Sequence, residues 1–158
     1  MADVQLIANP LFDDVAERAE ASPRRRMNHN FHSGPEDNPH RFLNVLLEGT
    51  YIRPHRHLSP PKSESFLVLE GIAEVILFDD RGTITARHQL GGQSAERVWG
   101  IDIPPGLWHT IVARTPRVVC YEVKPGPWIP GSDKEFAQWA PAEDDPTASV
   151  YCSKLLNG

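Results

Sequence analysis

The sequence predicts an all-β protein built as a double-stranded β-helix, or jelly-roll barrel, with a short N-terminal helix and an irregular C-terminal tail. Its 158 residues suit one domain with a sizeable core. The 15 prolines and 11 glycines favour a turn-rich β architecture over a helical one. Turn signals separate about eight short runs rich in β-branched and aromatic residues, the number of strands that a jelly roll needs.

The elements follow in order along the chain. Asn9-Pro10 begins a helix in which Leu11, Val15 and Ala19 recur every four residues, and Pro23 ends it. Residues 26–40, rich in Asn, His, Ser, Gly and Pro, predict an irregular arm or an edge strand. Strands are expected at 41–47, 51–57, 66–69, 73–78, 83–90, 98–103, 108–113 and 117–123.

Two of the turns and the division of the chain follow from the same pattern. Gly71 is expected to turn a tight hairpin between the strands at 66–69 and 73–78, and Asp79-Asp80-Arg81-Gly82 is a strong turn signal. The single domain would then consist of a helical segment (1–25), the barrel (26–128) and a tail (129–158) that packs on the barrel.

Composition and charge exclude several classes of function. With a formal net charge of −5, the chain lacks the excess of positive charge that is typical of proteins that bind nucleic acid. No uncharged apolar run reaches the roughly 18 residues of a membrane span, and the first five residues lack the basic and apolar regions of a signal peptide. Cys120 and Cys152 are too few for a disulfide framework. Cys120 is expected to be buried, and Cys152 lies near the terminus, where it could be exposed. We therefore expect a cytoplasmic protein, with exposed edge strands that would allow a homodimer.

A candidate metal site begins at His55 and His57. Alternate side chains of an extended strand point to the same face, so both imidazoles can meet one ion. An HxH pair alone is more often solvated or hydrogen-bonded than metal-bound. Here Glu64 follows, and His109 comes just after a Pro/Gly turn. Three imidazoles and a carboxylate predict one divalent transition-metal ion, which could be Zn, Fe, Mn, Ni or Co.

The spacing of these residues resembles the two motifs of the cupin superfamily, G(x)5HxH(x)3–4E(x)6G and G(x)5PxG(x)2H(x)3N. The positions that match are Gly49, His55, His57, Glu64 and Gly71 in the first motif, and Pro104, Gly106 and His109 in the second. Two departures matter. Six residues separate His57 from Glu64, which makes Glu64 the least certain ligand, and Val98 and Ala113 replace the Gly and Asn of the second motif.

The blocks PHRH, FDDRG, PPGLWH and EVKPGPW narrow the resemblance to small bacterial cupins of the WbuC type, which occur with O-antigen and other surface-polysaccharide genes. This resemblance implies a cupin jelly roll and a metal site. It does not settle what such proteins catalyse.

Further residues could line a substrate site near the metal. If His55 and His57 point inward, the alternation of side chains along their strand means that Tyr51 and Arg53 point inward too. In the same way, an inward His109 implies an inward Ile111. An inward Arg53 would demand an anion on the ligand or pair with Glu64 or Glu122. The candidate substrate-binding residues are Arg53, Tyr51, Lys62, Trp108, Asn30 and His32.

Other polar residues are ambiguous. Glu122 and Lys124 share a phase, and an inward pair would be costly without partners. Arg24-Arg25-Arg26 predicts a solvated turn or an anchor for an anionic group, and His40 and His88 are expected at the surface.

The leading functional hypothesis is a metal-dependent cupin acting on a small polar molecule, anionic or sugar-like, in surface-polysaccharide biosynthesis, as an isomerase or epimerase. Two alternatives stay open: a non-haem iron dioxygenase, and a non-catalytic module in which the metal organises a binding pocket. No catalytic residue is assigned from the sequence.

Overall fold

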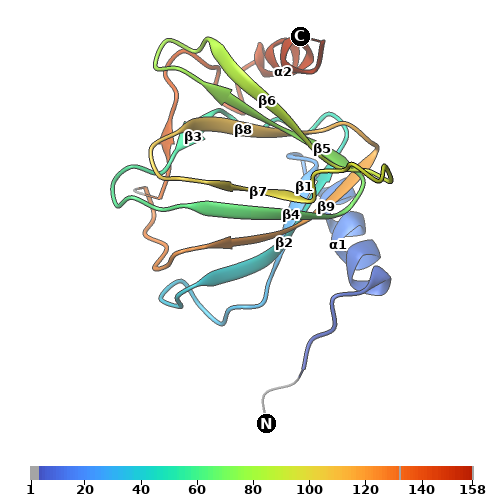
Figure 1. The fold of residues 1–158 in the computed structure, drawn as a ribbon. Coiled ribbons are helices and arrows are strands. Elements are labelled where there is room, and N and C mark those ends of the chain that lie inside the picture. Colours follow the sequence, from blue (N-terminus) through green and yellow to red (C-terminus); the bar gives the residue numbers. More distant parts are fainter. Residues whose placement is uncertain (1–3, 132, 158) are drawn as a thin grey trace.

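Two antiparallel five-stranded sheets face each other in the computed structural model, which describes residues 4–131 and 133–157 (Figure 1). In hydrogen-bonded order the first sheet contains β1 (Arg26–Asn30), β2 (His40–Leu47), β9 (Arg117–Lys124), β4 (Glu64–Glu70) and β7 (Gly100–Ile103). The second contains β10 (Glu135–Phe136), β3 (His55–Arg56), β8 (Trp108–Ala113), β5 (Ile72–Phe78) and β6 (Ile84–Gly91). Helices α1 (Asn9–Ala21) and α2 (Ala148–Asn157) lie at the two ends of the chain.

This arrangement confirms the predicted jelly roll, and each expected strand is present in at least part of its range. The tail is less irregular than expected, because it contributes β10 and α2. The ends of the predicted helical segment and tail, residues 1–3 and Gly158, lie outside the described residues.

The tight hairpin predicted around Gly71 is wrong. Strands β4 and β5 belong to different sheets, so Gly71 is a corner at which the chain crosses from one sheet to the other. Its φ of +79° lies in the left-handed region, and a Cβ there would lie 2.2 Å from the carbonyl oxygen of Arg117. The corner therefore requires glycine for both its backbone conformation and its close backbone contact.

Replacement of Gly71 by Ala is expected to lower the free energy of unfolding by at least about 1–2 kcal/mol, the cost of the left-handed conformation, with the clash against Arg117 adding to it. Chemical denaturation checks this. Gly34→Ala is the matched control, since a Cβ at Gly34 meets nothing within 4 Å. Equal stability of the two variants would contradict the requirement for glycine at position 71.

Each helix covers the outer face of one sheet. Phe12, Val15 and Ala19 of α1 pack with outward residues of β2 and β9, and α2 packs with β5 and β8 on the second sheet. Cys152 of α2 is therefore buried rather than exposed, with its thiol 3.6 Å from the carbonyl oxygen of Thr50. Among the described residues, neither helix has the length and apolar character that a bilayer crossing requires.

The barrel interior has an apolar part and a polar part. The apolar part is one cluster of buried side chains from both sheets: Leu46, Ile52, Phe66, Val68, Ala73, Val75, Leu90, Ile103, Ile111, Ala113, Val118 and Cys120. Strands β2, β4, β8 and β9 each continue from this cluster to inward polar residues. Asn44, Glu64, His109 and Glu122 lie on the same strand faces as these core residues, as the alternation of side chains requires.

Candidate metal centre

Four buried side chains converge from both sheets. His55 lies on β3 directly opposite His109 on β8, His57 follows β3, and Glu64 begins β4 of the other sheet. One donor atom from each of the four lies within 4.8 Å of the others, and no more than 3% of any of these residues is exposed. The six-residue loop before Glu64 closes on itself through a Leu58–Pro61 bridge, which lets β4 begin beside the histidines.

Backbone carbonyls hold all three imidazole rings by the Nδ1 atom. His55 Nδ1 lies 3.0 Å from the carbonyl oxygen of Arg53, His109 Nδ1 lies 2.9 Å from that of Leu107, and His57 Nδ1 is hydrogen-bonded to that of Asp133. A carbonyl only accepts, so each Nδ1 carries the proton and donates it. The Nε2 lone pairs are then free to point into the cluster, which is the tautomer of a metal ligand.

Two of the distances between donor atoms fit a shared ion. Glu64 Oε1 lies 2.9 Å from His57 Nε2, and Glu64 Oε2 lies 3.1 Å from His109 Nε2. Two donors that each lie 2.0–2.1 Å from one ion are about 2.8–3.4 Å apart. The Nε2 atom of His55 is also buried without a hydrogen-bond partner among the described residues, and that of His57 faces only the Glu64 carboxylate, which has no proton to donate. A buried polar atom without a partner is costly, and a metal ion would satisfy both.

Shifted pKa values give two of the candidate ligands, His55 and Glu64, the ionisation states that a metal ion needs. Burial, with the charge of Lys134 and then His109, holds the pKa of His55 well below its usual range, so its imidazole is neutral. Burial would raise the pKa of Glu64, but His109, His57 and the ammonium groups of Lys124 and Lys134 together hold it well below its usual range. Glu64 is therefore a carboxylate.

A buried network of charges supports the cluster. Lys62 Nζ lies 2.7 Å from Asp133 Oδ1 and donates to the carbonyl oxygen of Pro127 at 2.6 Å. Lys124 Nζ lies 3.1 Å from Asp133 Oδ2 and 3.4 Å from Glu64 Oε1. Lys62 was expected to line the mouth of the site, but its ammonium is occupied by these partners, and only 4% of the residue is exposed.

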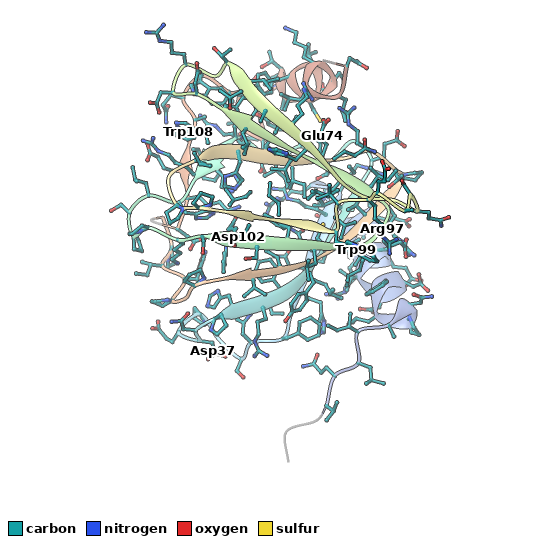
Figure 2. The ribbon with its side chains drawn as sticks, in the orientation of Figure 1. Asp37, Glu74, Arg97, Trp99, Asp102 and Trp108 are labelled. Atoms are coloured by element: carbon teal, nitrogen blue, oxygen red, sulfur yellow. The ribbon has the colours of Figure 1, made fainter. Side chains whose placement is uncertain are left out.

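Three other candidate residues lie away from the barrel interior. Trp108 begins β8 one residue before His109 and so points to the opposite face, where it packs with the tail and donates to Asp80 at 2.9 Å (Figure 2). Tyr51 lies in the same outer cluster, because residues 51–54 form no strand and their phase does not continue that of β3. Arg53 instead donates to the carbonyl oxygen of Ala137 at 2.6 Å, so its guanidinium is held by the tail rather than by Glu64 or Glu122.

A cavity of about 980 Å³ adjoins the cluster. Lys124 and Asp133 contribute to its wall and connect it to Glu64 and His57. Asn30 and His32, two of the candidate substrate-binding residues, line it, and their role in binding stays a prediction. His40 was expected at the surface, but it is 4% exposed and lines the cavity, with its ring stacked on that of His32 at 4.1 Å between centroids.

Sequence reasoning missed several residues of this wall, namely Phe42, Asn44, Lys134 and Phe136. The alternation of β2 could have indicated Phe42 and Asn44, since both share a face with the core residue Leu46. No periodicity indicates Lys134 or Phe136. Arg24 and Arg26 of the basic run also line the cavity, and both are paired with Glu143.

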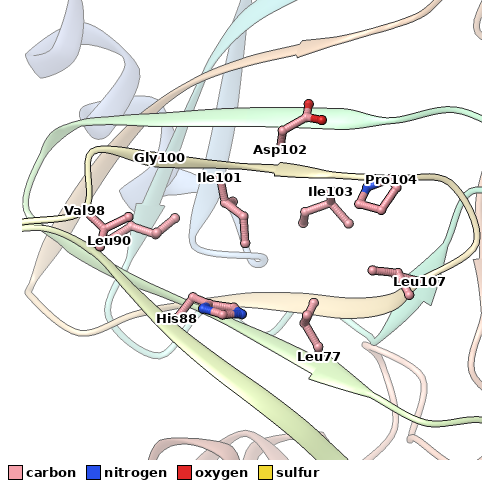
Figure 3. Close-up of a pocket in the computed structure, with 10 residues that line it drawn as sticks. All are labelled: Leu77, His88, Leu90, Val98, Gly100, Ile101, Asp102, Ile103, Pro104 and Leu107. Carbon is pink, nitrogen blue, oxygen red and sulfur yellow. The ribbon is translucent and has the colours of Figure 1, made fainter.

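A second, smaller hollow of about 320 Å³ lies between β7 and the hairpin of β5 and β6 (Figure 3). Its walls are mostly aliphatic, with Ile101 and Ile103 on one side and Leu77 on the other, while Asp102 points away. His88 lies at its exposed rim, at the surface as expected. Among its described lining residues this hollow offers only His88 and Asp102 as titratable groups, far fewer than the larger cavity does.

The buried carboxyl group of Glu122 should make the stability of the folded protein depend on pH. Burial, followed by the charge of Glu64, raises its pKa to about 8. Because this folded-state pKa exceeds that of the unfolded chain, the folded protein holds the proton between about pH 4.5 and 8. The free energy of unfolding should fall as pH rises through this window, by at most about 1.4 kcal/mol per pH unit.

Glu122→Gln should remove this slope while keeping an oxygen that accepts from Asn44, which lies 3.1 Å from Glu122. Denaturation midpoints of chelator-treated protein at pH 5 and pH 8 measure the effect, with the exposed Glu20→Gln as control. A slope that survives in Glu122→Gln would assign it to another group.

Together the two sheets form a jelly roll of the kind found in cupins, and the four-residue cluster inside it is a candidate metal centre. The chain belongs to the family described as a domain of unknown function, DUF6016, whose profile matches residues 7–90. No curated protein matches the sequence significantly.

Solved structures share the fold at low sequence identity. Protein SO0799 from Shewanella oneidensis superposes with a TM-score of 0.61 at 13% identity, over 90% of this chain and 95% of that one. The capsular polysaccharide assembling protein CapF from Staphylococcus aureus gives 0.55 at 20% identity, over 73% of this chain and 32% of CapF. KdgF from Halomonas sp. gives 0.50 at 16% identity, over 66% and 82%. This chain thus spans about a third of the length of CapF.

Proposed function

We propose that this protein binds one divalent transition-metal ion through His55, His57, Glu64 and His109 and acts on a small polar, anionic or sugar-like molecule in the adjoining cavity. The observation that carries the proposal is the set of three Nε2 atoms facing one carboxylate, each ring held by a backbone carbonyl on its other nitrogen. This donor set suits Zn, Fe, Mn, Ni or Co.

When bound, such an ion would supply Lewis-acid polarisation of a carbonyl or hydroxyl group. The chain itself supplies a group that can move a proton, as an isomerisation or epimerisation requires. Glu122 lines the cavity, Asn44 donates a hydrogen bond to its Oε2 at 3.1 Å, and its pKa of about 8 lies near neutrality. We assign Glu122 the role of acid or base in this proposal.

Two likenesses support a role in surface-polysaccharide biosynthesis. The sequence resembles WbuC-type cupins, and the barrel resembles part of CapF, which is named as a capsular polysaccharide assembling protein. CapF was also crystallised with 3-isopropenyl-tropolone as an inhibitor. A tropolone carries two adjacent oxygen atoms, the kind of group that we expect the metal centre to bind.

Elemental analysis of the purified protein beside a His55→Ala/His109→Ala variant tests the metal site. We expect about one transition-metal ion per wild-type chain and near-complete loss in the variant, because four ligands become two. His88→Ala, which changes an exposed histidine outside the cluster, is the control. Equal metal content in all three proteins would remove the proposed site.

Turnover is tested by incubating the metal-loaded protein with nucleotide sugars and following both product and oxygen. An isomerase or epimerase should convert substrate without consuming oxygen, and Glu122→Gln should lower the rate by about 100-fold or more. Substrate-dependent oxygen uptake would instead support a dioxygenase. Stabilisation by a ligand without any product would support a binding module.

A further inference from the structure

Lys134 has no ion-pair or hydrogen-bond partner for its ammonium among the described residues. The residue lies in the tail one position before β10 and lines the 980 Å³ cavity. It is half-buried, and the strand that begins at the next residue pairs with β3, with Phe136 directly opposite His55, which brings this segment to the metal cluster. An unpaired ammonium at this depth needs a physical reason.

The other cations of the cavity are paired. Arg26 contacts both carboxylate oxygens of Glu143 at 2.6 Å, and Arg24 lies 3.2 Å from the same carboxylate. Lys124 lies between Asp133 and Glu64. Lys134 is thus the exception in a wall whose positive groups otherwise have carboxylate partners.

The remaining carboxyl group of the cavity does not balance this charge. Burial and the charge of Glu64 raise the pKa of Glu122 to about 8, so this group is largely protonated at neutral pH. Burial also lowers the pKa of Lys134, although Glu64 opposes the shift. A divalent ion in the cluster would add further positive charge beside it. The described wall of the cavity therefore supplies no negative charge to pair with Lys134. A ligand can supply one.

We infer that the ligand of this cavity carries an oxyanion, a carboxylate or a phosphate, that pairs with Lys134 while other oxygen atoms of the same ligand approach the metal cluster. The inference rests on the proposed function and narrows its substrate class from anionic or sugar-like molecules to anionic ones. Lys134 is a specificity-determining residue in this account, because it distinguishes an acid from its neutral analogue.

Three small probes test it on zinc-loaded protein by titration calorimetry: catechol, 3,4-dihydroxybenzoate and 3,4-dihydroxyphenylphosphonate. All three offer the same adjacent oxygen atoms to the metal, and two add an oxyanion. One charge-assisted hydrogen bond corresponds to roughly 10-fold or more in affinity. We expect at least one anionic probe to bind about 10-fold more tightly than catechol, and its identity to tell a carboxylate site from a phosphate site.

Lys134→Met should abolish this preference, so that neither anionic probe binds the variant more tightly than catechol does, and Lys134→Arg should retain part of it. Lys154→Met, on the exposed face of α2, is the matched control. Lys134→Met removes an unpaired, half-buried charge, so the melting temperature of this variant should equal or exceed that of the wild type. A lower melting temperature would assign Lys134 a structural role and contradict the inference.

Equal affinity for catechol and both anionic probes, or a preference that survives Lys134→Met, would overturn the inference alone. Failure of all three probes to bind in a zinc-dependent manner would overturn the proposed function and this inference with it.

Discussion

Replacement of Asp133 by Asn is expected to lower the free energy of unfolding by about 3–5 kcal/mol, the usual cost of removing one partner from a buried ion pair. Asp133 is 6% exposed and lies between the ammonium groups of Lys62 and Lys124, at 2.7 and 3.1 Å. Asn keeps the shape of the side chain and the backbone carbonyl that holds His57, so the loss isolates the charge. Urea denaturation at pH 7 measures it.

The double variant Asp133→Asn/Lys62→Met should be less destabilised than the sum of the two single variants, because it removes both members of one pair. Asp144→Asn, at an exposed position in the tail, provides the matched control. The free energy of unfolding of Asp133→Asn could instead lie within about 0.5 kcal/mol of the wild-type value, the range typical of surface substitutions. That result would show that the buried network does not stabilise the fold.

Zinc is expected to raise the free energy of unfolding by about 4 kcal/mol when its free concentration is 1,000 times the dissociation constant. The folded chain gathers four donors from three separate strands and a loop, whereas the unfolded chain offers only the neighbouring pair at His55 and His57. Thermal and urea denaturation with and without a chelator measure the difference.

His57→Ala should lose most of this zinc-dependent stabilisation and should change the stability of the chelator-treated protein far less. His88→Ala should behave as the wild type does in both conditions. A zinc effect of equal size in His57→Ala would place the stabilising ion elsewhere on the protein.

The candidate ligands could be predicted from the sequence because each has a local signal. His55 and His57 share a strand face, and His109 follows a Pro/Gly turn at a characteristic spacing. Glu64 was the least certain, and the structure brings it to the cluster because the longer loop closes at Leu58 and Pro61. The ligand role of all four residues stays a prediction until metal is measured.

The surroundings of the cluster were harder to predict, for physical reasons. Asp133 and Lys134 reach the site only because β10 pairs with β3, a contact between segments about 80 residues apart that no local pattern encodes. Trp108 was misplaced for a different reason: nearness in sequence to His109 was taken as nearness to the site, although successive residues of a strand point to opposite faces.

The separation of the barrel interior into an apolar and a polar part has an evolutionary consequence. Aliphatic side chains fill one end of the interior and the cavity lies at the other, so substitutions at the exposed cavity residues Asn28 or Asn30 should change which molecules fit with little effect on folding. Relatives that share the same scaffold and donor quartet are then free to diverge in the compounds they accept.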